Sequence, residues 1–107
     1  MDWRVVYLND SVRVEVESLS VEHRAQFRRI VELIAAKGLE RVHEPYIKHV
    51  EDKLWEMRLS GRGGIARVVY VTASGRRIVL LHAFEKKTRK TPRRALEIAR
   101  ARAKEVQ

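Results

Sequence analysis

The spacing of apolar residues along the chain predicts two long helices. Between Ser20 and Gly38 apolar residues recur every three or four positions, which is the pattern of an amphipathic helix. Ser20 has a side chain typical of a helix N-cap, and Lys37-Gly38 is a typical helix end. Near the C-terminus Thr91 is predicted to cap a second helix, with Pro92 at its first position. The predicted buried stripe of this helix consists of Leu96, Ala99, Ala103 and Val106.

Four other segments have the composition or the alternation of strands. The first is rich in β-branched and aromatic side chains. The second alternates apolar side chains on one predicted face with Glu56 and Arg58 on the other. The last is apolar on both faces, which is typical of a central strand. The predicted strands are residues 3–8, 54–59, 65–72 and 77–84.

The remaining segments are assigned from weaker patterns. Residues 11–19 fit two structures, because their valines alternate as in a strand and also share one helical face; a short helix is the favoured interpretation. Residues 39–52 are predicted to be a polar connection. The resulting order, β-α-α-β-β-β-α, predicts one α+β domain over residues 1–107, with helices on one face of a mainly antiparallel sheet. Trp55 and Phe84 are expected in its core.

Positive charge is concentrated in the second half of the chain. Residues 1–55 contain nine Lys or Arg and ten Asp or Glu, whereas residues 56–107 contain fourteen and four. This asymmetry predicts a polyanionic partner: nucleic acid, an anionic membrane surface or an acidic protein. Membrane binding is disfavoured, because the basic C-terminal helix has only a narrow Leu/Ala stripe beside its cations.

Composition also limits the compartment and the chemistry. The chain contains no cysteine, which fits a reducing cytoplasm and excludes thiolate metal sites and thiol nucleophiles. Its four histidines lack the short spacings of metal ligands, and its glycine-rich turn lies between two predicted strands, unlike a phosphate loop. No apolar segment is long enough for a membrane span or a secretion signal. A soluble cytoplasmic protein without metal or cofactor is therefore expected.

Basic residues on successive predicted strands are the main candidates for chemistry. Arg58, Arg67 and Lys87 are expected to converge on one surface if neighbouring strands pair as hairpins. Converging cations bind phosphate and stabilise the charge that develops during phosphoryl transfer. Because RNA carries its own nucleophile, the 2′-hydroxyl, such a surface suits a metal-free ribonuclease. The alternative for each of these residues is an ordinary structural or surface ion pair.

Two further side chains are candidates for proton transfer. Tyr70 and His82 lie on predicted strands and can act as acid or base, but Tyr70 also fits the edge of the core and His82 an ordinary position in the sheet. The additional cations expected to bind RNA are Lys48, Lys86, Arg89, Lys90, Arg93 and Arg94.

Three short motifs occur in a characteristic order. They are Leu54-x-Glu56-x-Arg58, Arg67-x-x-Tyr70 and Phe84-x-Lys86-Lys87-Thr88-x-Lys90-Thr91-Pro92. Together with the helix that ends at Lys37-Gly38, they cover nearly the whole chain. In order and spacing they resemble the phage-derived HigB-like branch of the RelE/ParE toxin superfamily.

The resemblance implies the toxin of a type II toxin–antitoxin system, with an antitoxin partner that is expected to contain a helix-turn-helix DNA-binding domain. Many relatives enter the bacterial ribosome and cleave mRNA there, so the expected function is that of an mRNA interferase, a metal-independent endoribonuclease. In relatives the arginine before the strand tyrosine and the basic residue after the last strand contact the scissile phosphate, which implies these roles for Arg67 and Lys87. A basic residue on the preceding strand corresponds to Arg58.

The chain departs from RelE itself at two places. Glu56 stands where RelE has a strand lysine, and the final helix has no aromatic residue to match the C-terminal tyrosine of RelE. The identity of the general acid or base therefore stays open. Two other functions also stay open: a ParE-like inhibitor of DNA gyrase, and a basic RNA-binding module that does not cleave.

Overall fold

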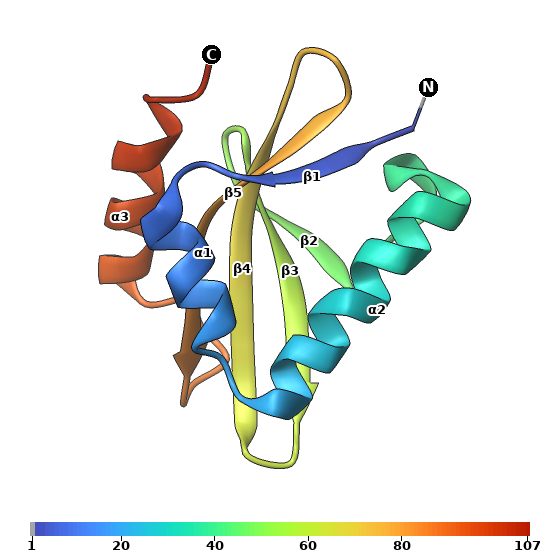
Figure 1. The fold of residues 1–107 in the computed structure, drawn as a ribbon. Coiled ribbons are helices and arrows are strands. Elements are labelled where there is room, and N and C mark those ends of the chain that lie inside the picture. Colours follow the sequence, from blue (N-terminus) through green and yellow to red (C-terminus); the bar gives the residue numbers. More distant parts are fainter. Residues whose placement is uncertain (1) are drawn as a thin grey trace.

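The computed structural model describes residues 2–107 and shows helices packed on a five-stranded sheet (Figure 1). The α+β class predicted from the sequence is confirmed. No helix in the described residues is both long and apolar enough to span a membrane. In chain order the elements are β1 (Arg4–Tyr7), α1 (Asp10–Glu17), α2 (Val21–Lys37), η1 (Leu39–Arg41), β2 (Ile47–Glu51), β3 (Leu54–Gly61), β4 (Gly64–Ala73), β5 (Arg77–Lys86) and α3 (Arg93–Ala103).

The five strands form one sheet in the order β1-β5-β4-β3-β2. β1 runs parallel to β5, and the other neighbouring strands are antiparallel, which confirms the mainly antiparallel sheet. The long central pair is β4 with β5, and the register of this pair shifts between Val69 and Tyr70. Both central strands carry residues that the sequence identified as candidates for chemistry.

Helices cover both faces of the sheet, which corrects the prediction that all of them share one face. Val68 of β4 belongs to the same buried cluster as Val12 of α1 and Ile30 of α2. Val69, the next residue of β4, packs in a second cluster with Ala99 of α3 (Figure 1). Because β4 is apolar on both faces, each face requires a covering layer.

Residues 39–52 contain η1 and the edge strand β2, which corrects the prediction of a polar connection. β2 pairs only with β3, and Lys48 and His49 in its middle are exposed. An exposed edge strand shows little apolar alternation, so its sequence pattern is weak. The additional strand has a consequence for the site, because Lys48 pairs in register with Glu56 of β3.

The ends of α1 and α2 follow from local side-chain chemistry. Asn9 Oδ1 accepts a hydrogen bond from the Val12 N–H at 3.1 Å, and Ser20 Oγ accepts one from the His23 N–H at 3.1 Å. Gly38 ends α2 with a φ of 87°, a left-handed conformation that favours glycine. The predicted short first helix and the predicted limits of the second are therefore confirmed.

α3 begins slightly later than predicted. Pro92 is its N-cap and Arg93 its first residue. The predicted cap, Thr91, instead donates a hydrogen bond from Oγ1 to Glu56 Oε1 at 3.0 Å. The helix buries Ala99 as predicted and also Ala95. The other predicted members of the stripe are only half-buried: Leu96, Ala103 and Val106.

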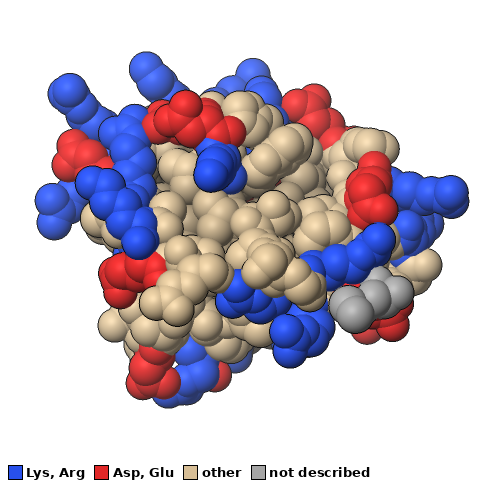
Figure 2. Space-filling model, turned by 90° about the horizontal axis from the view of Figure 1, so that it is seen from above, with Lys and Arg blue, Asp and Glu red and all other residues tan. Residues whose placement is uncertain are grey.

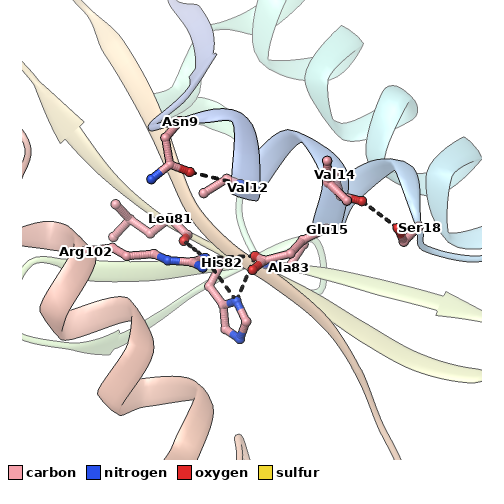
Figure 3. Close-up of polar contacts among 9 residues, drawn as sticks. All are labelled: Asn9, Val12, Val14, Glu15, Ser18, Leu81, His82, Ala83 and Arg102. Carbon is pink, nitrogen blue, oxygen red and sulfur yellow. Dashed lines mark hydrogen bonds and ion pairs between the residues drawn. The ribbon is translucent and has the colours of Figure 1, made fainter.

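Side chains from two helices cover the free edge of β5 (Figure 3). β1 pairs only with the first four residues of β5, and within residues 2–107 no other strand lies beside the rest of this edge. There the Ala83 N–H donates to Glu15 Oε1 of α1 at 3.2 Å, and Arg102 Nη1 of α3 donates to the Leu81 carbonyl at 2.8 Å. Such contacts satisfy the edge backbone and hinder pairing with another chain.

The Glu15 carboxylate also contacts two side chains at this edge, His82 and Arg102. His82 Nδ1 lies 2.8 Å and Arg102 Nη1 2.9 Å from its Oε1 (Figure 3). Burial alone would raise the pKa of Glu15, but the hydrogen bonds from Arg102, His82 and Ala83 outweigh it, and the pKa is lowered. A carboxylate whose pKa is lower in the folded state stabilises the fold above its unfolded-state pKa. That stability is lost as the pH falls through the folded-state pKa.

The variant Glu15→Gln is expected to lower the free energy of unfolding at pH 7 by about 1–3 kcal/mol, because it removes a charged acceptor from a half-buried network. The difference from wild type should shrink below the ordinary pKa of 4.5, as the wild-type carboxylate also becomes neutral. Urea unfolding at neutral and acidic pH measures both effects. Glu17→Gln, an exposed change on the same helix, is the control and should shift stability by no more than about 0.5 kcal/mol. An equal loss for Glu15→Gln at both pH values would contradict this account.

Candidate functional site

Three cations from three neighbouring strands lie on one face of the sheet. Arg58 of β3 pairs in register with Arg67 of β4, and Arg67 pairs with Phe84 of β5. Lys86 stands two residues beyond Phe84, so strand alternation places its side chain on the same face. This is the face that α3 covers further along the strands. We call Glu56, Arg58, Arg67 and Lys86 the sheet cluster.

Glu56 is the counter-charge within the sheet cluster. Its Oε2 lies 2.9 Å from Arg67 Nε and 3.7 Å from Arg58 Nε. Its Oε1 accepts the hydrogen bond from Thr91 described above. Arg67 is only 3% exposed and Lys86 6%, whereas Arg58 is half-buried. One carboxylate therefore faces three cations, and the excess positive charge suits the binding of a phosphate.

Burial is the main influence on ionisation in the sheet cluster. It lowers the pKa of the Lys86 ammonium, Arg67 lowers that pKa further, and Glu56 acts in the opposite direction. Burial also lowers the pKa of the Arg67 guanidinium, partly offset by Glu56. Arginine stays cationic at neutral pH because its ordinary pKa is so high. A lysine with a lowered pKa releases its proton more readily than an ordinary lysine does.

The segment 87–92 joins β5 to α3 and is tied to the sheet cluster at two points. Lys86 Nζ donates a hydrogen bond to the Arg89 carbonyl, and Thr91 donates one to Glu56. Within the segment, Thr88 Oγ1 donates to the Lys90 carbonyl at 3.2 Å. The exposed cations of the segment are Lys87, Arg89 and Lys90. They form a basic rim beside the buried cations.

Arg93 and Arg94 extend this rim onto the first turn of α3, where both are exposed. The N-terminus of a helix carries partial positive charge and favours acidic side chains, yet the first turn of α3 has none. Two arginines there are unfavourable for the helix itself, which favours a role in binding an anion. At the end of the molecule that holds both termini, Figure 2 shows Lys and Arg interspersed with Asp and Glu around a centre of other residues.

The structure places Lys86, and not Lys87, in the sheet cluster. This corrects the expectation that Lys87 converges with Arg58 and Arg67. Lys87 follows the end of β5 and is exposed, because successive residues of an extended chain point in opposite directions. Lys48 shares the face of the cluster through its register with Glu56, but it is exposed and its Nζ lies 3.9 Å from Glu44 Oε1.

The two candidates for proton transfer lie outside the sheet cluster. Tyr70 is on the opposite face of β4 from Arg67 and is 1% exposed, and burial raises the pKa of its phenol. His82 is separated from Lys86 by Phe84, whose ring stacks on the imidazole with centroids 5.0 Å apart. Neither side chain is brought to the three cations. In the described residues no group of three His, Asp or Glu is arranged to hold a metal ion.

The sequence placed Glu56 on the same face as Arg58 and left an ordinary ion pair open as the alternative for Arg58 and for Arg67. The structure contains both ion pairs, each with Glu56. Sequence reasoning missed the structural role of Thr91. Nothing in the sequence indicated that Thr91 would bond to Glu56 of β3, 35 residues earlier in the chain, and not cap α3. That contact depends on how segment 87–92 folds back over the sheet.

Comparison with known proteins identifies the family. Residues 14–104 match the model of the phage-derived Gp49-like protein family (DUF891). The chain belongs to this family. It also resembles the crystal structure of the archaeal RelE–RelB complex from Pyrococcus horikoshii OT3, at 21% identity and a TM-score of 0.54, over 84% of this chain and 100% of that one. No curated protein sequence matches the chain significantly. The Gp49-like protein therefore has the RelE-type fold, and the assignment to the RelE superfamily is confirmed.

Proposed function

We propose that this Gp49-like protein is the toxin of a type II toxin–antitoxin system and acts as an mRNA interferase that cleaves mRNA on the ribosome. The observation that carries the proposal is the sheet cluster, in which three cations from three strands share a single carboxylate. A fold shared by several functions does not decide among them, whereas a concentration of phosphate ligands favours RNA. Translation would be inhibited because the cleaved mRNA could no longer be translated.

In the proposed reaction the 2′-hydroxyl oxygen attacks the neighbouring phosphorus and the 5′-oxygen leaves, which produces a 2′,3′-cyclic phosphate. The attacking hydroxyl loses its proton to solvent. Arg58 and Arg67 bind the non-bridging oxygens, where charge increases in the transition state. Lys86 gives a proton to the leaving 5′-oxygen, a role that suits an ammonium with a lowered pKa.

The burial of Arg67 implies that RNA binding moves part of segment 87–92. Thr91 would release Glu56, and the phosphate would then reach the guanidinium. The cations of the rim would bind neighbouring phosphates of the message, an interaction that depends strongly on salt. These cations are Lys87, Arg89, Lys90, Arg93 and Arg94, with Lys48 at the far side of the same face.

The proposed partner in the cell is an antitoxin with an acidic or amphipathic segment and a helix-turn-helix DNA-binding domain. The similar archaeal structure is a complex of RelE with RelB. The net charge of +9 favours an acidic partner segment by electrostatic complementarity. Both messages and ribosomes are cytoplasmic, so we place the protein there as well.

The difference between Lys86 and Lys87 tests the proposal. With purified protein and translating ribosomes, Lys86→Ala is expected to slow mRNA cleavage about 10²–10³-fold, as for loss of one donor to the transition state. Lys87→Ala should leave the cleavage rate of bound RNA near that of wild type. It should instead flatten the salt dependence of RNA binding by about 0.7 log unit for one lost contact.

A chemical control accompanies this comparison. A message with a 2′-deoxynucleotide at the cleavage position should resist the wild-type protein, because it lacks the proposed nucleophile. Cleavage of the deoxy-substituted message, or a rate for Lys87→Ala as low as that for Lys86→Ala, would contradict the assignment.

A further inference from the structure

Two adjoining clefts lie on the α2 side of the sheet, opposite the sheet cluster. The first has a volume of about 370 Å³ and is lined by aromatic and apolar side chains, among them Trp3, Trp55 and Tyr70, together with Glu40. The second has a volume of about 400 Å³. Val42 and His43 line both, so the clefts share one wall.

The second cleft is cationic. Arg29 and Lys37 of α2 and Arg41 of η1 line it, with the ring of Tyr46 beside them. Among residues 2–107, none of these three cations forms an ion pair with a carboxylate. Glu44 also lines the cleft, and its Oε1 lies 3.9 Å from Lys48 Nζ. The cleft therefore has three cations and one carboxylate in its lining, which leaves it positively charged.

The first cleft holds tryptophans in fixed positions. Trp3 Nε1 donates to Glu40 Oε1 at 2.8 Å, and the Arg76 guanidinium lies 5.6 Å from the centre of the Trp3 ring. Trp55 was expected in the core but is 39% exposed, with His49 packed edge-on at 5.0 Å. A large aromatic ring left open to solvent in a cleft indicates a binding surface.

We propose that the two clefts form a second RNA site, which takes one base of a single strand in the aromatic cleft and the adjacent phosphate in the cationic cleft. Stacking on aromatic rings beside cations is how proteins bind single-stranded nucleic acid. Because His43 lines both clefts, one RNA chain can place a base in the aromatic cleft and the phosphate next to that base in the cationic cleft. The site lies on the face opposite Arg67, so it binds a nucleotide other than the one being cleaved. Binding here needs no cleavage and can fail or succeed independently of the proposed enzymatic function.

Glu40 gives the site a preference among bases. Its carboxylate is held by Trp3 at the wall of the aromatic cleft. A carboxylate accepts hydrogen bonds from an exocyclic amine such as that of cytosine. Uracil has no such amine, so oligocytidine should bind more tightly than oligouridine.

Tryptophan fluorescence reports on this site directly, because the chain has two tryptophans and both line the aromatic cleft. The probes are 2′-O-methyl octamers of cytidine and of uridine, which lack the hydroxyl required for cleavage. The cytidine octamer is expected to quench the fluorescence of the full-length protein saturably, with at least about a fivefold lower Kd than the uridine octamer. Lys37→Ala/Arg41→Ala should raise that Kd at least about tenfold and flatten its salt dependence.

The control variant removes two positive charges that lie outside both clefts. Lys53→Ala/Arg62→Ala changes two exposed cations that line neither cleft and should leave the Kd within about twofold of wild type. Arg67→Lys should also leave quenching unchanged, which separates this site from the sheet cluster. Three results would overturn the proposal: no quenching by either octamer, equal quenching in Lys37→Ala/Arg41→Ala, or equally tight quenching by polyglutamate, which would indicate an acidic protein partner.

Discussion

Arg67→Ala is expected to slow mRNA cleavage on the ribosome about 10²–10³-fold, the loss typical of removing one charge-stabilising donor. Arg67 is the central cation of the sheet cluster, since it pairs in register with Arg58 and lies 2.9 Å from Glu56. Without it, Glu56 would be paired with Arg58 alone, at 3.7 Å. Single-turnover cleavage with saturating ribosomes measures the chemical step separately from binding.

Arg67→Ala is also expected to lower the stability of the fold, because it removes one partner of a buried ion pair, so a second variant is needed. Arg67→Lys retains a cation beside Glu56 but loses the planar fork that holds two phosphate oxygens, so it should fold and still cleave at least about tenfold more slowly. Arg62→Ala, an exposed change in the turn between β3 and β4, should cleave at the wild-type rate. Folded Arg67→Ala and Arg67→Lys proteins that both cleave normally would refute the role of Arg67.

Glu56→Leu is expected to lower the free energy of unfolding by about 3–5 kcal/mol, the cost of leaving a buried charge without its partner. Arg67 would remain 3% exposed with Lys86 nearby and no carboxylate between them. The loss of the acceptor for Thr91 would add to the effect. Urea unfolding with a constant slope against denaturant measures the change.

A double variant separates the ion pair from simple packing. Replacing both partners by apolar residues, Glu56→Leu/Arg67→Met, removes the unpaired charge and should be more stable than either single variant. Strictly additive losses, or a loss below about 1 kcal/mol for Glu56→Leu, would show that Glu56 does not hold the cluster together.

The parts of the fold that depend on local chemistry could be predicted from the sequence. Ser20 and Gly38 set the limits of α2 because each satisfies the helix backbone at its own end. The pairing of Arg58 with Arg67 on one face followed from strand alternation and a hairpin between β3 and β4. The helix limits needed only the residues at each end of α2, and the pairing of the arginines needed only the two-residue period of a strand.

The parts that depend on contacts between distant segments could not be predicted in this way. The edge strand β2 has a single neighbour and an exposed middle, so its pattern resembles that of a loop. The choice of Lys86 over Lys87 depends on where β5 ends, a boundary that composition does not fix. The attachment of Glu15 to His82 links residues 67 positions apart and also explains why His82 is unavailable to the sheet cluster.

The most direct test of the central claim is to map mRNA 5′ ends in cells that express wild-type protein or Arg67→Lys at equal levels. If the cations of the sheet cluster act together on one RNA phosphate, wild type should produce discrete new 5′ ends and growth arrest, and Arg67→Lys should produce far fewer ends. Growth arrest without new 5′ ends, accompanied by linearised plasmid DNA, would instead indicate a gyrase inhibitor and contradict the account.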